Sequence, residues 1–305
     1  MRVFVDSTGF TADLPEIPND LDSTASILAL ASAKGGSGKS LLAANFAVAF
    51  ALAGKKVGIV DADLNAPSIF TMLGVKPPMH LDIGGIQPVA GPLGLRIVDS
   101  HLIAEGLRPA FSFAGLGEVE AIAAASQPIE IGYAATLRRI LFESRFGALD
   151  VLIVDLAPGL EHIYRLSAML ARTEFVIVSH PTVHSAHGAK ETFEMHRQGR
   201  LRVVGVVENM LGFNCETCRA VRPLFPEGEM SRVAREAGIP VIARLPFDPR
   251  LGESSERGVP FLQGEPEMPL SKQLTATARQ ILGMLTVKPR TEVVPDRIAA
   301  LGGSR

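Results

Sequence analysis

A glycine-rich segment placed between an apolar run and a helix-like stretch constrains the fold of this chain more than any other feature. It follows Ile27–Ala31, precedes Leu41–Gly54, and reads Ala33-Lys34-Gly35-Gly36-Ser37-Gly38-Lys39-Ser40. Glycines in such a loop let backbone N–H groups turn toward phosphate oxygens, and the N-terminus of the following helix adds partial positive charge. An ordinary glycine-rich turn is the alternative, but the strand–loop–helix order predicts a phosphate-binding loop in an α/β domain.

We expect this loop to bind ATP, and its side chains have distinct predicted roles. Lys39 would reach the β and γ phosphates, and the Ser40 hydroxyl would ligate Mg²⁺. Ala33 stands where the pattern G-x-x-x-x-G-K-[ST] usually begins with glycine, and Lys34 supplies a second lysine, so the motif has its deviant form. The other residues expected to contact the nucleotide are Gly35, Gly36, Ser37, Gly38 and Leu41.

Apolar runs recur along the chain, with helix-length segments between most of them. The seven candidate strands are Ile27–Ala31, Val57–Val60, Leu95–Val98, Val151–Val154, Phe175–Val178, Val203–Val207 and Val241–Leu245. Runs without polar alternation are typical of strands buried on both faces. The pattern predicts a doubly wound, mainly parallel α/β sheet, in which ligands bind beyond the carboxyl ends of the strands.

The same pattern predicts a single elaborated domain. The P-loop domain would span residues 26–285, with an N-terminal extension at 1–25, a Cys-containing insertion at 211–228 and a polar tail at 286–305. The longest mostly apolar stretch, Leu41–Ala53, is shorter than the roughly 18 residues expected of a membrane span. No secretory signal is recognised at the start of the chain. We therefore expect a cytoplasmic protein.

Charge does not name a macromolecular partner. Thirty Lys and Arg residues oppose 32 Asp and Glu residues, for a net charge of −2. No global field therefore points to nucleic acid or to an anionic membrane, and neither is expected as a partner.

Carboxylates follow two of the predicted strands. Asp61 and Asp63 end the second run on one face, where one could orient an attacking water and the other could hold the magnesium shell. A pair that caps a helix is the alternative. Asp155 ends the fourth run and is followed by a Pro158-Gly159 loop, which is typical of a magnesium-facing aspartate with a switch.

Together these motifs resemble those of the Mrp/ApbC family of iron–sulfur cluster carrier ATPases, within the deviant P-loop ATPases that include ParA and MinD proteins. The segments that carry the resemblance are Lys34–Ser40, Asp61–Asp63 with Pro67-Ser68, Asp155–Gly159, Val207–Met210, Cys215–Cys218 and Leu245–Arg250. The cysteine pair directly after the Glu-Asn-Met segment is specific to the Mrp branch. The resemblance therefore implies a slow ATPase that carries a cluster to apo-protein clients.

The resemblance also implies roles for individual residues. Lys34 would cross a nucleotide-sandwich dimer to touch the partner's phosphates. Asp63 would orient the hydrolytic water, with Asp61 near the metal, and Asp155 would act through a magnesium-bound water. The residues matching adenine contacts are Asn209, Pro246 and Asp248.

Cys215 and Cys218 are the only two cysteines, and they match the cluster ligands of the family. A cluster or a zinc site normally takes four protein ligands, so one chain supplies half of a site. Two copies related by a two-fold axis complete the count, which predicts a homodimer with a bridging cluster, most simply 4Fe-4S. The alternatives are zinc, a redox disulfide, a cysteine pair with a distant ligand, and an inert turn.

Other features depart from the family or favour a rival. Leu160 and His162 stand in the switch region where the family has other residues, which indicates altered hydrolysis and makes His162 a candidate switch contact. His180, His184 and His187 have helical spacing, but Pro181 makes a continuous helix through them unfavourable. We therefore interpret them as surface or capping residues rather than metal ligands. The rival functions are a ParA- or MinD-like positioning ATPase and, because of Leu160 and His162, a regulatory binding protein with a degenerate ATPase site.

Overall fold

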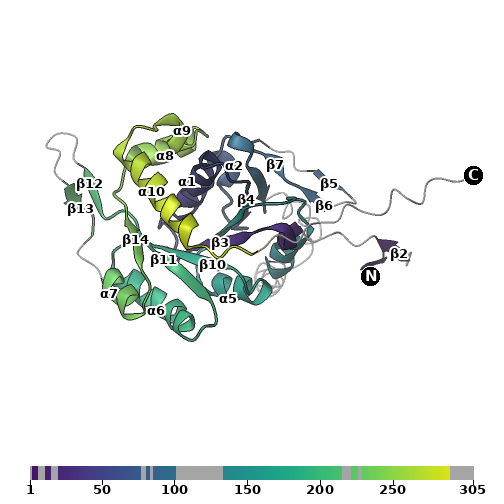
Figure 1. The fold of residues 1–305 in the computed structure, drawn as a ribbon, viewed down its shortest axis with the longest axis horizontal. Helices are drawn as coiled ribbons and strands as arrows, with labels where there is room; N and C mark the ends of the chain where they lie inside the picture. The colour runs from purple at the N-terminus through teal and green to yellow at the C-terminus, as the bar shows by residue number, and fades with distance from the viewer. Residues whose placement is uncertain are drawn as a thin grey trace, which may run out of the picture.

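An eight-stranded sheet forms the centre of the protein (Figure 1). The computed structural model describes residues 2–5, 11–14, 20–76, 80–82, 85–100, 133–214, 221–225 and 229–288. From one edge to the other the strands are β14 (Val241–Arg244), β11 (Arg202–Glu208), β10 (Glu174–Ser179), β3 (Ser26–Ala31), β9 (Val151–Leu156), β4 (Val57–Ala62), β8 (Arg96–Asp99) and β7 (Val89–Ala90). All neighbours pair in parallel except β7 and β8.

This arrangement confirms the predicted doubly wound, mainly parallel sheet. Each of the seven predicted apolar runs coincides with a strand of the sheet, and β7 is the one strand that the runs did not predict. The central strands β3, β9, β4 and β10 are buried along their whole length, as expected for strands covered on both faces.

Helices cover both faces of the sheet (Figure 1). One face is covered by α1 (Lys39–Leu52), α2 (Ile69–Met72), α8 (Pro249–Glu256), α9 (Phe261–Gly264) and α10 (Pro269–Met284). The other is covered by the helical residues 133–143, α5 (Leu160–Met169), α6 (Val183–Arg197) and α7 (Met230–Glu236). Two apolar cores result, one on each side of the sheet.

Helix α1, which follows the phosphate loop, is the most deeply enclosed helix of its layer. It is rich in apolar residues on all sides, and it packs against β3, β4 and β9 of the sheet and against the neighbouring α10. Such an all-round apolar helix is stable only when covered on more than one side. Among the residues that the structure describes, no helix combines the length and the apolar character needed to cross a membrane.

Shorter elements decorate this domain. They are the hairpins β1 (Arg2–Val5) with β2 (Thr11–Leu14), β5 (His80–Asp82) with β6 (Gly85–Gln87) and β12 (Gly212–Asn214) with β13 (Val221–Pro223), and the 3-10 turns η1 (Asp20–Ser23) and η2 (Pro92–Gly94). Leu21 and Ala25 belong to the predicted N-terminal extension, yet both are buried. The Lys288 N–H donates to the Ala25 carbonyl at 3.0 Å, so the two ends of the predicted domain meet.

Replacing Phe46 with Ala tests the packing of α1. Phe46 is fully buried in this helix, so we expect a loss of about 3–5 kcal/mol in the free energy of unfolding, from lost apolar burial and the cavity left behind. Leu52 lies on the same helix but is 54% exposed, and Leu52→Ala is the matched control. Urea denaturation measures both, and equal losses would contradict the described packing.

Candidate functional site

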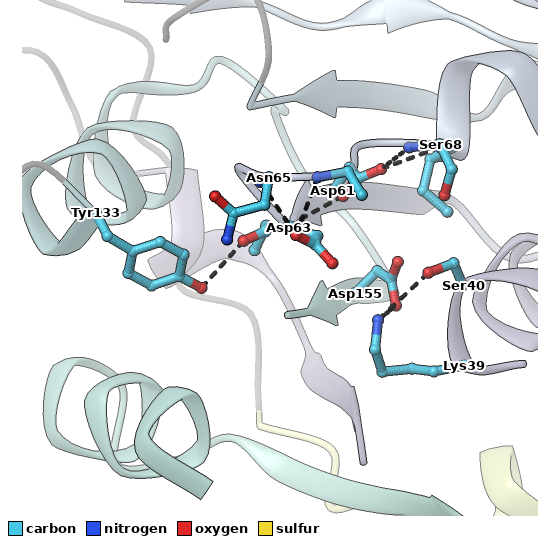
Figure 2. Close-up of polar contacts among 11 residues, drawn as sticks. Lys39, Ser40, Asp61, Asp63, Asn65, Ser68, Tyr133 and Asp155 are labelled. Atoms are coloured by element: carbon cyan, nitrogen blue, oxygen red, sulfur yellow. Dashed lines mark hydrogen bonds and ion pairs between the residues drawn. The ribbon is translucent and has the colours of Figure 1, made fainter. Parts of the chain in front are cut away.

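A buried ion pair joins the phosphate loop to the sheet. Lys39, the first residue of α1, places its Nζ 2.5 Å from Oδ1 of Asp155 on β9 and 3.3 Å from the Ser40 hydroxyl (Figure 2). Both charged side chains are buried. Burial raises the pKa of Asp155, and the charge of Lys39 opposes that rise. The predicted phosphate-binding lysine and the predicted magnesium-facing aspartate thus lie in direct contact.

Three carboxylates line the carboxyl ends of neighbouring strands. In the sheet register Asp155 of β9 lies beside Asp61 of β4, which in turn lies beside Asp99 of β8. All three are buried. Burial and the charges of Asp155 and Asp99 raise the pKa of Asp61, while N–H groups of Ile69 and Ser68 oppose that rise. This edge of the sheet is therefore suited to a cation.

Asp61 and Asp63 both cap the turn that follows β4 (Figure 2). Asp61 accepts hydrogen bonds from the N–H groups of Asp63 at 3.1 Å and of Ser68 at 2.7 Å. Asp63 Oδ1 accepts from the N–H groups of Asn65 at 3.1 Å and Ala66 at 3.2 Å. Of the helix-capping pair that the sequence left as the alternative, only Asp61 reaches the start of α2, by accepting from the Ile69 N–H at 3.0 Å, while Asp63 holds the turn. Asp63 itself is half-buried and lies at the carboxyl ends of the strands, close to Asp61 and Asp155.

The donor set fits a magnesium ion held together with phosphate. Asp155 Oδ2 is buried and has no hydrogen-bond partner, and the Ser40 hydroxyl lies next to Lys39 on the same edge. Carboxylate and hydroxyl oxygens are the hard ligands that Mg²⁺ prefers, and it usually takes one or two carboxylates plus substrate phosphates. Within the described ranges no group of three His, Cys, Asp or Glu residues is placed to hold a metal alone.

The side chain of Asn209 supports the phosphate loop through a hydrogen bond to its backbone. It follows β11, is buried, and its Nδ2 donates to the Ser37 carbonyl at 2.9 Å. Gly38 has a φ of +83°, and a Cβ on Gly38 would lie 2.5 Å from the Asn209 Nδ2. Only glycine suits this position, because of both its backbone and the close approach. The adenine contact expected of Asn209 stays a prediction.

Two further predicted adenine residues lie next to α8. Asp248 caps this helix by accepting from the Arg250 N–H at 3.1 Å, and it pairs with the Arg250 side chain at 2.6 Å. The hydrogen bond from Arg250 lowers the pKa of Asp248. Pro246 precedes Asp248 in the segment that follows β14. Their contact with adenine stays a prediction, as does the reach of the exposed Lys34 to a partner's phosphates.

Cys215 and Cys218 lie outside the described residues, in the connection between β12 and β13. The hairpin itself is tied to the segment after β14. The Leu211 N–H donates to the Leu245 carbonyl at 3.0 Å, and the Phe247 N–H donates to the Gly212 carbonyl at 2.7 Å. The chain thus leads from the phosphate-loop support at 209 directly into the cysteine-bearing connection.

Two of the three neighbouring histidines lie on the surface, as the sequence predicted, and His180 is half-buried. α6 begins two residues after Pro181, and both His184 and His187 are exposed on it. The His180 ring contacts the Phe225 ring of the hairpin, with centroids 5.2 Å apart. His162 on α5 is mostly buried, and burial lowers its pKa. The His162 Nε2 atom lies 3.4 Å from the Glu161 carboxylate, and the His162 ring packs against that of Tyr133.

Two residues of this site were missed by the sequence analysis. Asp99 ends an apolar run just as Asp61 does, so its position after the third strand was the available signal. Tyr133 donates to the Ala62 carbonyl at 3.0 Å from the helical residues 133–143, and no local pattern marks it.

Gly38→Ala tests the close approach of Asn209 to the loop. The added methyl group would displace Asn209 and strain a positive φ, so we expect ATP affinity to fall at least tenfold, with a stability loss of about 1–3 kcal/mol. Gly54 has a φ of +78° with open space around it, so Gly54→Ala carries the backbone strain without the collision. Isothermal titration and urea denaturation measure both. Equal ATP affinity in the two variants would refute the loop-support role.

Comparisons with known proteins agree with this geometry. A family model described as "NUBPL iron-transfer P-loop NTPase", of the ParA group, matches residues 23–282. An iron-sulfur cluster carrier protein of Saccharolobus solfataricus is 33% identical over 84% of this chain and 82% of its own length. The cytosolic Fe-S cluster assembly factor NUBP2 of Bos taurus is 32% identical over 87% of this chain and 95% of its own length.

Solved structures of nucleotide-binding proteins are similar to this chain. A nucleotide-binding protein of Archaeoglobus fulgidus in complex with ADP has a TM-score of 0.62 and 30% identity, over 79% of this chain and 89% of its own. The cell division ATPase MinD of Pyrococcus furiosus has a TM-score of 0.56 at 21% identity, over 86% of this chain and all of its own, which shows a shared fold. The resemblance found in the motifs is confirmed: the chain belongs to the NUBPL iron-transfer P-loop NTPase family, within the ParA/MinD superfamily.

Proposed function

We propose that this protein is a slow, ATP-hydrolysing iron–sulfur cluster carrier that holds a cluster between the Cys215/Cys218 pairs of two subunits and passes it to apo-proteins. ATPase activity follows from membership of the P-loop NTPase family. The observation that carries the proposal is the short connection between the two halves of the function. Asn209 supports the phosphate loop, and the hairpin that leads into Cys215 begins three residues later.

The nucleotide half uses the groups that meet at the carboxyl edge of the sheet. Lys39, which contacts Ser40 and Asp155, would reach the β and γ phosphates, and Ser40 and the carboxylates Asp155 and Asp61 would hold Mg²⁺. A Mg²⁺ ion held by these residues would supply positive charge that offsets the charge of the phosphates. Asp63 would orient the attacking water, and Lys34 of a second subunit would add positive charge at the phosphates.

The cluster half follows from the count of ligands. One chain supplies two thiolates, so a four-ligand cluster requires a second copy. The hairpin strands that lead into the cysteines are flanked by Leu224, which is 44% exposed, and Phe247, which is 38% exposed. Exposed apolar side chains beside the cysteine-bearing connection suit contact with a second subunit. The names of the relatives, which include iron-sulfur cluster carriers, support the same cargo.

A short segment of chain connects the phosphate loop to the hairpin that leads into the cysteines, and it could transmit a change at one to the other. A phosphate bound at Ser37 and Gly38 would act on the backbone that Asn209 supports. Met210 follows with a φ of +59°, a left-handed conformation uncommon for a side chain of this type, and the hairpin starts beyond it. A shift of the loop would therefore reach β12 through two residues.

The positioning function of MinD-like proteins is the second candidate, and no specific observation in the described part of the chain favours it. Its support is the shared fold at 21% identity, which does not extend to function.

Lys39→Ala tests the nucleotide half. Loss of the ammonium removes the charge that meets the phosphates and leaves the buried Asp155 unpaired, so we expect ATP binding or turnover to be abolished. Lys55→Ala, at an exposed lysine beyond the same helix, is the control and should behave as wild type. Phosphate release measures turnover. Unchanged hydrolysis in Lys39→Ala would overturn the assignment.

The double variant Cys215→Ser, Cys218→Ser tests the cluster half. Hydroxyl groups replace the thiolate ligands, so we expect anaerobically reconstituted protein to lose its visible absorption and its bound iron while it keeps ATP affinity. Lys39→Ala serves as the reciprocal control, because it should keep the cluster. Iron content equal to wild type in the double variant would refute the ligand assignment.

A further inference from the structure

Tyr133 links the end of β4 to the helix that follows the switch loop. Its hydroxyl donates to the Ala62 carbonyl at 3.0 Å, and its side chain is buried (Figure 2). Ala62 is the last residue of β4 and directly precedes Asp63. The tyrosine therefore holds the peptide group from which the Asp63 side chain extends.

The ring of Tyr133 packs against two side chains of α5. The His162 ring lies 4.6 Å away between centroids, at 54°, and the Arg165 guanidinium carbon lies 5.6 Å from the Tyr133 ring centroid. These two residues are three apart on α5, so they present one face of the helix to the ring. α5 begins directly after the Pro158-Gly159 loop that follows Asp155.

The hydroxyl is suited to a permanent donor role. Burial and the charge of Asp63 raise the pKa of Tyr133 above its ordinary value, so the hydroxyl keeps its proton throughout the neutral range. On the other side the turn is held by its own contacts, including the Asp63 N–H to Asp61 Oδ1 at 3.1 Å. Tyr133 thus adds a contact from outside the turn.

We propose that Tyr133 is a positioning residue of the ATPase reaction. Its hydroxyl fixes the Ala62–Asp63 peptide, so that the Asp63 carboxylate stays where it orients the attacking water. Its ring, packed against His162 and Arg165, fixes the position of this turn relative to α5. This inference rests on the proposed role of Asp63. Small misplacements of a catalytic group cost large factors in rate, so the hydroxyl influences kcat although it never touches the nucleotide.

Tyr133→Phe is the primary test, because it keeps the ring against His162 and Arg165 and removes only the hydroxyl. We expect kcat for ATP to fall on the order of tenfold, with KM within about twofold of wild type and a small fall in the unfolding midpoint, because the buried Ala62 carbonyl loses a donor. The chain has two tyrosines, and Tyr164→Phe on α5 is the matched control, with wild-type kcat expected. A purely structural role would instead raise KM as kcat falls, and would overturn the proposal, as would a wild-type kcat.

A double-mutant cycle with Asp63 separates this proposal from the one on which it rests. Asp63→Asn should lower the single-turnover rate, followed with radiolabelled ATP so that slow residual hydrolysis is measured. Adding Tyr133→Phe to Asp63→Asn should lower the rate no further, because the hydroxyl acts through Asp63. A wild-type rate for Asp63→Asn alone would refute the proposed role of Asp63. Losses that multiply in the double variant would refute the positioning role of Tyr133.

Discussion

The contact between Lys39 and Asp155 is the interaction on which the rest of the site depends. It places an ammonium group and a carboxylate 2.5 Å apart, both buried, where the phosphate loop meets the sheet. A buried charge without its partner is costly, so each group requires the other. The pair therefore fixes the start of α1 against the end of β9, and it keeps positive charge where phosphates would bind.

The parallel sheet accounts for the remaining charges. The carboxyl ends of its parallel strands all lie at one edge, and the register of β9, β4 and β8 sets Asp155, Asp61 and Asp99 side by side without a dedicated loop. The resulting mutual repulsion is offset by Lys39 and by backbone N–H donors. Such a site is suited to bind a cation together with a phosphate chain. The cation would offset the charge of the carboxylates, and the phosphate oxygens would complete the ligands of the cation.

Much of this could be read from the sequence, because the signals were local. The glycine loop, the apolar runs and the aspartates Asp61, Asp63 and Asp155 each depend on a few adjacent residues. Asp99 had the same local signal as Asp61, the end of an apolar run, and was overlooked. Tyr133 had no such signal, because its role depends on a hydrogen bond between residues 71 apart in the chain. The support of the phosphate loop at residue 209, which spans 172 residues, was hidden for the same reason.

The central claim is that one chain holds half of a cluster site. Native mass spectrometry of the anaerobically reconstituted full-length protein tests it most directly, because the mass reports chains, iron and sulfide together. The account predicts two chains with one [4Fe–4S] cluster, and no cluster on single chains. A complete cluster on a monomer, or a dimer that contains zinc and no sulfide, would contradict it.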